Sequence, residues 1–403
     1  MNDAFTQLGV GEALTNGLQK AGITQPTGIQ TQVIPFVLAG KDVIGQSATG
    51  TGKTLAYLLP LFHKIDSSKR EMQALVLAPT YELAMQIQKQ VELLAANSGL
   101  PVTSLPIIGD VNIVRQIEKL REKPHIIVGS SGRILELIQK RKISAHTIKT
   151  IVLDEGDRLL GDQHLEGVKA IIKTTLKDRQ LLLFSATIKP GTVELAKSLM
   201  REPELVRVTP QAQDQPDITH WYFVTELREK MDVLRKIARS IEGERALVFI
   251  NKQDNVEVTV AKLNFQGLAA ASLHGSASKA ERKKALEDFR NGKIQLLVAS
   301  DIAARGLDIP GVDYVINLDM PDEAQIYLHR VGRTGRAGRS GTAISIVTAG
   351  ETQYIEKCEK ALKITMQKKQ MVRGEMADKK VRQTNLKPQK VQPVKVKQTE
   401  IKK

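Results

Sequence analysis

Short apolar runs that alternate with longer amphipathic stretches characterise the first half of the chain. The runs lie at residues 74–78, 126–128, 151–153 and 181–184, and each is followed by a small or polar cluster and then by helical periodicity. Strands of a parallel sheet are covered by helices on both faces, so they show apolar runs of this kind. The pattern predicts an α/β domain with a parallel sheet over residues 1–208.

This alternation is interrupted once and then resumes. Residues 209–216 read TPQAQDQP, with two prolines, three glutamines and no apolar period, which is typical of a linker. Apolar runs return at residues 246–250, 268–273, 296–299, 314–318 and 343–347. They predict a second α/β domain over residues 217–366, and a length of 403 residues agrees with two domains.

The last part of the chain has a different composition. Residues 371–403 hold ten Lys or Arg and three acidic residues, with almost no apolar periodicity. A segment of this composition cannot bury enough apolar surface to offset the entropy lost on ordering it. We therefore predict a disordered basic tail, which we delimit at residues 367–403.

The bulk composition narrows the class of partner. A formal net charge of +15 favours a polyanion, since Lys and Arg release counterions from phosphates, and RNA, DNA and anionic lipid surfaces all fit. The single cysteine, Cys358, excludes an intrachain disulfide and a Cys-rich zinc site. Because no signal peptide and no run of about 18 apolar residues occurs, we expect a soluble, cytoplasmic protein.

A glycine-rich segment, SATGTGKT at residues 47–54, follows a strand-like run and precedes an amphipathic helix. In this context the segment predicts a P-loop, whose backbone N–H groups cradle phosphate at a helix N-terminus. Lys53 would reach the β and γ phosphates, and the Thr54 hydroxyl would bind magnesium. A glycine-rich turn without a ligand is the alternative. The expected nucleotide contacts of the loop are Ala48, Thr49, Gly50, Thr51, Gly52, Lys53 and Thr54.

Asp154 and Glu155 follow the apolar run at residues 151–153, so they emerge at the carboxyl edge of the predicted sheet, where such folds bind ligands. Asp154 is placed to hold magnesium through a water, and Glu155 to orient or deprotonate the attacking water. An acidic pair after a strand is by itself more often a solvated strand end. Together with the P-loop, the pair predicts a site that hydrolyses a nucleoside triphosphate with Mg²⁺.

Four blocks then point to one family. VLDEGDRLL at residues 152–160, SATGTGKT, the Ser185 to Thr187 triplet SAT and YLHRVGRTGRAG at residues 327–338 closely resemble the motifs of DEAD-box RNA helicases, in the family's order and spacing. Phe5 and GITQPTGIQ at residues 22–30 are similar to the family's Q motif. The resemblance covers residues 3 to about 350 and implies two tandem RecA-like domains of the P-loop NTPase class.

The resemblance also implies roles for individual residues. Gln30 would read adenine, with Phe5, Ile23 and Thr27 around it, and Asp308 of SDIAARGLD would contact the ribose. Arg333 and Arg336 resemble arginine fingers, and a planar, permanently charged guanidinium is well suited to charge spread over phosphoryl oxygens. A general phosphate-binding stripe of arginines is the alternative. The residues expected to couple hydrolysis to strand separation are Asp157, Ser185, Thr187, His329 and Arg330.

RNA in this family is held mainly through phosphates and ribose hydroxyls, which implies little sequence preference. The implied contacts are Pro79, Thr80, Glu82, Gly109, Gly132, Arg133, Lys279, Arg282, Ser300 and Gly306. Several RNA-side positions depart from the family pattern: Tyr81 replaces arginine, Asp110 replaces a glycine, Ser131 replaces a proline and Lys279 replaces a glutamine. In the signature itself, Gly156 replaces alanine.

The ATP-side motifs are nearly intact, so we infer a core that hydrolyses ATP but binds RNA more weakly than usual. The basic tail would then tether structured RNA, or it serves only for solubility. The predicted function is ATP-dependent separation of short RNA duplexes or remodelling of RNA and protein complexes. An ATP-gated RNA clamp and a DNA helicase are the alternatives, although Gln30 and DEGD weigh against DNA. Similar small bacterial members imply ribosomal precursor particles or RNA-decay proteins as partners.

Overall fold

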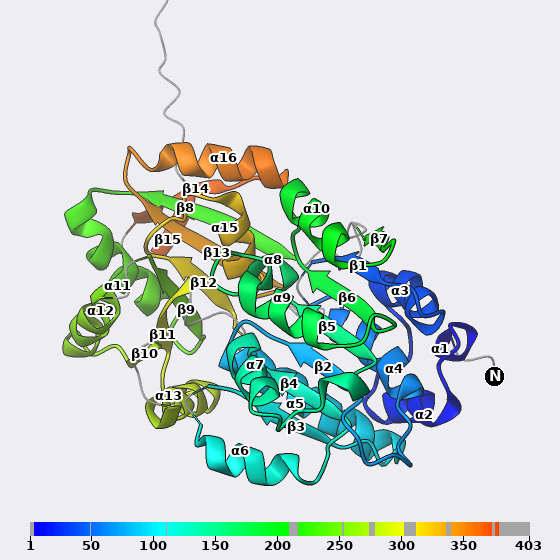
Figure 1. Cartoon of the computed structure of the whole chain (residues 1–403). Coiled ribbons are helices and arrows are strands. Elements are labelled where there is room, and N and C mark those ends of the chain that lie inside the picture. The colour runs from blue at the N-terminus through cyan, green and yellow to red at the C-terminus, as the bar shows by residue number, and fades with distance from the viewer. Residues whose placement is uncertain are drawn as a thin grey trace, which may run out of the picture.

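The computed structural model describes residues 4–48, 50–109, 111–208, 217–251, 254–273, 279–301, 312–335, 340–372 and 375–378. These residues form two α/β domains, each built on a sheet that helices cover on both faces (Figure 1). Within the described part of the chain, no helix combines the length and the apolar character that a membrane span requires.

The sheet of the first domain has seven parallel strands in the order β3-β4-β2-β5-β6-β1-β7. Its strands are β1 (Val43–Gln46), β2 (Ala74–Leu77), β3 (Ser104–Ile107), β4 (Ile126–Gly129), β5 (Thr150–Asp154), β6 (Gln180–Ser185) and β7 (Glu204–Arg207). The predicted apolar runs coincide with β2, β4, β5 and β6, which are buried throughout. This confirms the parallel α/β fold expected for the first domain.

Two separate cores hold the helices of this domain against the sheet. The first core joins one sheet face to α1 (Ala4–Gln7), α2 (Glu12–Lys20), α3 (Gly28–Leu38), α4 (Lys53–Lys64) and α5 (Tyr81–Ser98). The second joins the other face to α6 (Ile113–Leu120), α7 (Ser131–Gln139), α8 (Gly156–Leu159), α9 (Leu165–Thr174) and α10 (Pro190–Leu199), with η1 (Ala145–Thr147) leading into β5. Successive residues of a strand therefore serve opposite cores, as the two-residue period requires.

The second domain has the sheet order β10-β11-β9-β12-β13-β8-β14-β15. The strands are β8 (Ile218–Val224), β9 (Ala246–Ile250), β10 (Ala270–Leu273), β11 (Leu296–Ser300), β12 (Tyr314–Asn317), β13 (Gly341–Val347), β14 (Gln367–Val372) and β15 (Glu375–Asp378). The helices are η2 (Leu227–Glu229), α11 (Lys230–Ser240), α12 (Asp254–Phe265), α13 (Lys279–Arg290), α15 (Ala324–Val331) and α16 (Thr352–Leu362). The second predicted α/β domain is thereby confirmed.

The predicted start of the tail at residue 367 is wrong. β14 pairs with β8, β15 pairs antiparallel with β14, and Met371 and Met376 pack against the core of the second domain. Lys369 Nζ lies 5.0 Å from the centre of the Trp221 ring, so a charged residue is paired with an aromatic face across the strands. Composition alone does not reveal such partners. Residues 379–403 and the linker 209–216 lie outside the described residues.

Candidate active site between the domains

The phosphate-binding loop connects β1 to α4. Gly50 and Gly52 have φ angles of +81° and +86°, a region that residues with a Cβ rarely adopt. A Cβ at Gly52 would also collide with the side-chain amide of Gln30, so glycine is needed for α3 to approach the loop. Lys53 Nζ donates to the carbonyl oxygens of Ser47 and Ala48 at 2.6 and 2.7 Å. Of the predicted loop residues, Thr49 alone lies outside the described part.

Gln30 is tied to this loop from α3. It is buried, its Nε2 donates to the carbonyl oxygen of Gly52 at 3.1 Å, and its Oε1 accepts from the backbone N–H of Thr27 at 2.9 Å. The structure therefore brings the predicted adenine-side residues to the P-loop, while adenine recognition itself stays a prediction. Phe5 is fully buried in the first core, and Ile23 packs against that core.

The acidic pair lies at the carboxyl end of β5. Asp154 is buried, accepts from the Tyr57 hydroxyl at 2.8 Å and accepts from the backbone N–H of Glu155 at 2.9 Å. Burial raises the pKa of the Asp154 carboxyl to about 6, and the Tyr57 hydrogen bond and the Lys53 charge oppose this rise. Glu155 has a positive φ of 52° and forms an ion pair of 3.1 Å with Arg158.

Asp157 connects the acidic segment to the end of β6. Its Oδ1 accepts from the Ser185 hydroxyl at 2.7 Å, and its Oδ2 accepts from the Thr187 hydroxyl at 3.2 Å. The structure thus brings together three of the residues that the resemblance implied for coupling. Asp157 therefore ties the acidic segment to the loop that follows β6.

A cavity of about 310 Å³ joins these groups to the second domain. Its lining includes Gly50, Gly52, Lys53, Thr54, Asp154, Glu155, Asp157 and Ser185 from the first domain, and His329 and Arg333 from the second. Arg333 is 9% exposed, so its guanidinium is largely withdrawn from bulk water. Arg336 and Asp308, which were predicted to complete this site, lie outside the described residues.

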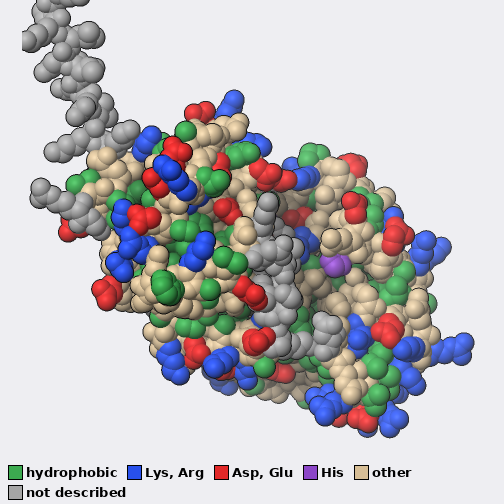
Figure 2. Space-filling model, turned by 90° about the vertical axis from the view of Figure 1, so that its left-hand side faces the viewer, with side chains coloured by type: hydrophobic (Ala, Val, Ile, Leu, Met, Phe, Trp, Pro, Cys, Tyr) green, Lys and Arg blue, Asp and Glu red, His purple; other side chains and the backbone are tan. Residues whose placement is uncertain are grey.

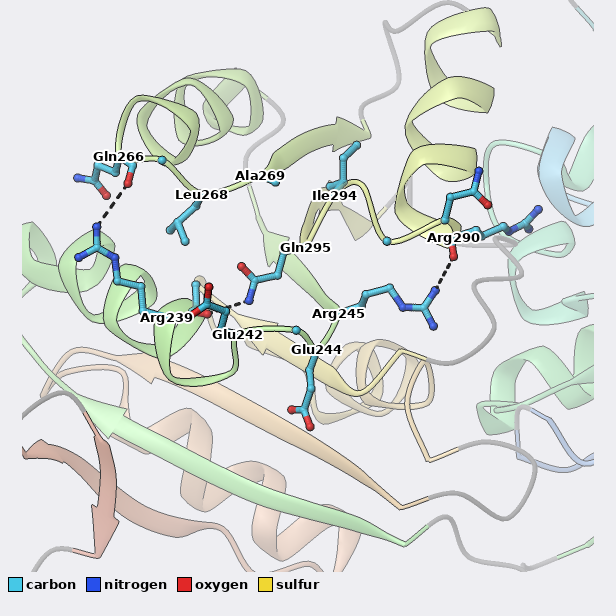
Figure 3. Close-up of a pocket in the computed structure, with 15 residues that line it drawn as sticks. Arg239, Glu242, Glu244, Arg245, Gln266, Leu268, Ala269, Arg290, Ile294 and Gln295 are labelled. Atoms are coloured by element: carbon cyan, nitrogen blue, oxygen red, sulfur yellow. Dashed lines mark hydrogen bonds between the residues drawn. The ribbon is translucent and has the colours of Figure 1, made fainter.

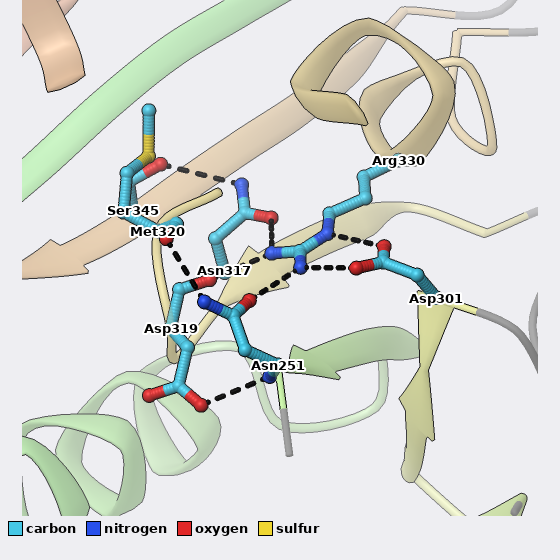
Figure 4. A network of polar contacts seen from close by, with 7 residues as sticks. All are labelled: Asn251, Asp301, Asn317, Asp319, Met320, Arg330 and Ser345. Carbon is cyan, nitrogen blue, oxygen red and sulfur yellow. Dashed lines mark hydrogen bonds and ion pairs between the residues drawn. The ribbon is translucent and has the colours of Figure 1, made fainter. Parts of the chain in front are cut away.

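Arg330 does not line this cavity. It is 1% exposed and lies inside the second domain, where its Nε and Nη2 donate to the two carboxylate oxygens of Asp301 at 2.6 and 2.7 Å (Figure 4). It also donates to Asn251, to Asn317 and to the carbonyl oxygen of Asp319. Arg330 therefore fixes α15 against the ends of β9, β11 and β12, while its role in coupling stays a prediction.

The predicted RNA contacts of the first domain follow neighbouring strands. Pro79 and Thr80 follow β2, and the Thr80 hydroxyl caps α5 by accepting from the backbone N–H of Leu83 at 3.2 Å. Gly109 follows β3, and Gly132 lies in the first turn of α7, after β4. Since β3, β4 and β2 are adjacent and parallel, these residues share the carboxyl edge of the sheet. Asp110 lies outside the described residues.

Three further predicted RNA contacts are engaged with protein. Glu82 of the first domain and Arg282 on α13 of the second form an ion pair, so these residues bridge the domains. Arg133 donates to the carbonyl oxygen of Val111 and pairs with Glu136 at 3.1 Å. Ser300, at the end of β11, has a buried hydroxyl without a hydrogen-bond partner among the described residues. For Lys279 only the backbone is described, and Gly306 lies outside the described part.

Tyr57 is the functional neighbour that the sequence analysis missed. It is fully buried on α4, one turn after Lys53, and its ring packs against Phe184 with 5.3 Å between ring centres. A buried tyrosine hydroxyl usually finds a polar partner, so a tyrosine on an apolar helix face next to the P-loop could have indicated this hydrogen bond. The partner itself, Asp154, is 97 residues away and is fixed only by the tertiary structure.

Comparisons with known proteins agree with this geometry. The family model described as DEAD/DEAH box helicase matches residues 27–196, and the model described as helicase conserved C-terminal domain matches residues 229–338. The DEAD-box ATP-dependent RNA helicase CshC of Bacillus cereus is 43% identical over 367 residues, which cover 91% of this chain and 93% of CshC. This chain belongs to the DEAD-box helicase family.

Other relatives of this DEAD-box helicase span the same two domains. The probable ATP-dependent RNA helicase YfmL of Bacillus subtilis is 44% identical over 359 residues, which cover 89% of this chain and 94% of YfmL. Among solved structures, Saccharomyces cerevisiae Dbp5 bound to RNA and ADP BeF3 has a TM-score of 0.83 at 29% identity, with 91% of this chain and 95% of Dbp5 covered. The predicted fold and family are therefore confirmed.

Proposed function

We propose that this DEAD-box helicase hydrolyses ATP in the cavity between its domains and uses the cycle to separate short RNA duplexes or to remodel RNA and protein complexes. The observation that carries the proposal is that one cavity of about 310 Å³ is lined by Lys53 and Glu155 from the first domain and by Arg333 from the second. A site divided in this way is complete only when the domains are closed, which links hydrolysis to domain movement.

The residues of the cavity fit each part of phosphoryl transfer. Thr54 and Asp154 offer the hard oxygen atoms that Mg²⁺ prefers, and Mg²⁺ commonly uses one or two such ligands together with water and substrate phosphates. Bound there, Mg²⁺ would neutralise charge on the phosphates. Lys53 would hold the phosphates, Glu155 would orient the attacking water, and Arg333 would stabilise charge on the phosphoryl oxygens.

RNA is proposed to cross the carboxyl edge of the first sheet and continue onto the second domain. The strand ends that carry Thr80, Gly109 and Gly132 meet at that edge, and the Glu82 to Arg282 ion pair joins the same edge to α13. Backbone N–H groups and hydroxyls there suit phosphate and ribose contacts, which carry little sequence preference. Ribosomal precursor particles and RNA-decay proteins in the cytoplasm are the proposed partners, in line with the bacterial RNA helicases among the relatives.

The proposal is tested by ATP hydrolysis and unwinding of a short RNA duplex, with duplex DNA in parallel. We expect Glu155→Gln and Arg333→Ala each to lower RNA-stimulated kcat by about 10²–10⁴-fold while RNA binding is retained. Arg228→Ala, a change of an exposed arginine on η2, is the matched control and should leave kcat unchanged. Equal activity of Arg333→Ala and wild type would refute the divided site. Hydrolysis without strand separation would favour the ATP-gated clamp.

A further inference from the structure

A second cationic cavity lies on the first domain, away from the site between the domains. Its volume is about 470 Å³. Six cationic or titratable basic side chains line it together with one acidic residue, Glu71, and the six are Arg70, Arg121, Lys123, Arg141, Lys142 and His146. All six are exposed at the surface. This convergence of one sign of charge is unusual, because like charges around one hollow repel each other.

These six residues, which we call the basic cluster, lie at a different edge of the sheet from the ATP site. Its residues stand just before β2, before β4 and before β5, which are neighbours in the order β4-β2-β5. The cluster therefore occupies the amino edge of the sheet, whereas Lys53, Asp154 and the predicted RNA contacts occupy the carboxyl edge. An RNA strand bound only at the carboxyl edge does not reach it.

The charges of the cluster are not balanced within the protein. Among the described residues, the side chains of these six form no ion pair and no hydrogen bond, although neighbouring Lys140 pairs with Glu136 at 2.7 Å. The helices α6 and α7 end at the cavity, and a helix C-terminus attracts a cation by about 0.3–1 kcal/mol. Two helix ends account for one or two cations, so most of the charge has no structural partner.

A cavity of the second domain provides the contrast. It also contains three arginines, but Glu242 and Glu244 lie among them (Figure 3). Arg239 donates to the carbonyl oxygen of Gln266, and Arg245 donates to that of Arg290. Those arginines act within the fold as caps of helix ends. On the face shown in Figure 2, Lys and Arg are likewise interspersed with acidic side chains.

We propose that the basic cluster is a second RNA-binding surface, which holds the sugar and phosphate backbone of substrate RNA that extends beyond the strand in the cleft. Its lining contains cations and no Phe, Tyr or Trp, so it suits phosphates rather than bases. The inference rests on the proposed RNA-dependent function. Contacts between RNA and the basic cluster would add affinity without involving Tyr81, the position at which the family has an arginine.

The test compares two variants with the same loss of charge. The cluster variant carries Arg70→Gln, Arg121→Gln and Lys142→Gln, and the control carries Arg228→Gln, Lys262→Gln and Lys360→Gln, which are exposed residues of the second domain. Affinity is measured against salt concentration for a short single strand that fits only the cleft and for the same strand extended by a hairpin. Circular dichroism melting establishes that both variants are folded.

For the extended RNA, we expect the slope of log K against log salt to fall by about 2–3 in the cluster variant, because each lost phosphate contact removes roughly 0.7–0.9. The short strand and the control variant should keep the wild-type slope, and kcat at saturating RNA should be unchanged. Equal slopes for the extended RNA, or an equal loss with the short strand, would overturn the proposal. A further pair of results would also overturn the proposal. In that case inorganic triphosphate binds wild-type protein but not the cluster variant, and it displaces neither RNA from the wild-type protein. Absence of unwinding by wild type would instead count against the proposed function, because the salt slopes do not depend on unwinding.

Discussion

Replacement of Arg330 should destabilise the second domain more than any surface substitution. The guanidinium is almost completely buried, forms two hydrogen bonds with Asp301 and three with Asn251, Asn317 and the carbonyl oxygen of Asp319, and lies 5.1 Å from the centre of the Phe249 ring. In Arg330→Met the aliphatic volume is kept and the charge is lost. Asp301 then remains as an uncompensated carboxylate, and removal of one partner of a buried pair costs about 3–5 kcal/mol.

Unfolding in urea measures this loss in the second domain alone. The chain has one tryptophan, Trp221, on β8 of the same sheet, so its fluorescence reports that domain and not the first. With a urea dependence of about 2 kcal/mol per M, a loss of about 4 kcal/mol lowers the midpoint by about 2 M. Arg228→Met is the exposed control and should shift the midpoint little.

A double variant separates the ion pair from general packing. In the Arg330→Met background, Asp301→Asn removes the orphaned charge and should recover about 1–2 kcal/mol, although it destabilises the wild-type background. The remaining loss belongs to Asn251, Asn317 and the Asp319 carbonyl, which stay without their donor. The role of the ion pair is refuted if Arg330→Met lowers the urea midpoint by less than about 0.5 M. It is also refuted if adding Asp301→Asn lowers the stability of the Arg330→Met variant further, because the ion pair would then not be what holds α15 to the sheet.

Two further predictions concern pH and packing. Burial lowers the pKa of the His220 imidazole to about 4 from 6.5, so the unfolded state binds more protons between these values, and the second domain should lose about 1–2 kcal/mol as the pH falls from about 7 to about 5. Urea midpoints from Trp221 fluorescence check this loss of stability. His220→Gln, which can still accept from the Tyr327 hydroxyl, should show no such loss. An equal loss in that variant would contradict the assignment to His220. A Cβ at Gly156 would lie 2.5 Å from Cγ of Leu183, so Gly156→Ala should cost about 1–3 kcal/mol although it restores the alanine usual in the family. Calorimetry of the first domain's transition checks it, and a cost that does not shrink in a Leu183→Ala background would exclude this collision as the cause.

The sequence of neighbouring residues was enough to predict the ATP side of the site. A P-loop acts through consecutive backbone N–H groups at the start of one helix, so its chemistry is contained in residues 47–54. Asp154 and Glu155 could be added because a buried parallel strand always ends at the ligand-binding edge of its sheet. Apolar runs likewise predicted both domains, since strands buried on two faces need no partner information to be recognised.

Contacts between distant segments decided the rest. The Tyr57 to Asp154 hydrogen bond, the Glu82 to Arg282 ion pair and the Arg330 network each join residues that are far apart in the chain, and no local period encodes such pairs. β14 was assigned to the tail because no apolar run marks it as a strand, whereas its two lysines lie over aromatic rings of β8. The basic cluster is visible only after folding, because three separate loops carry it and the sheet alone brings their charges to one edge.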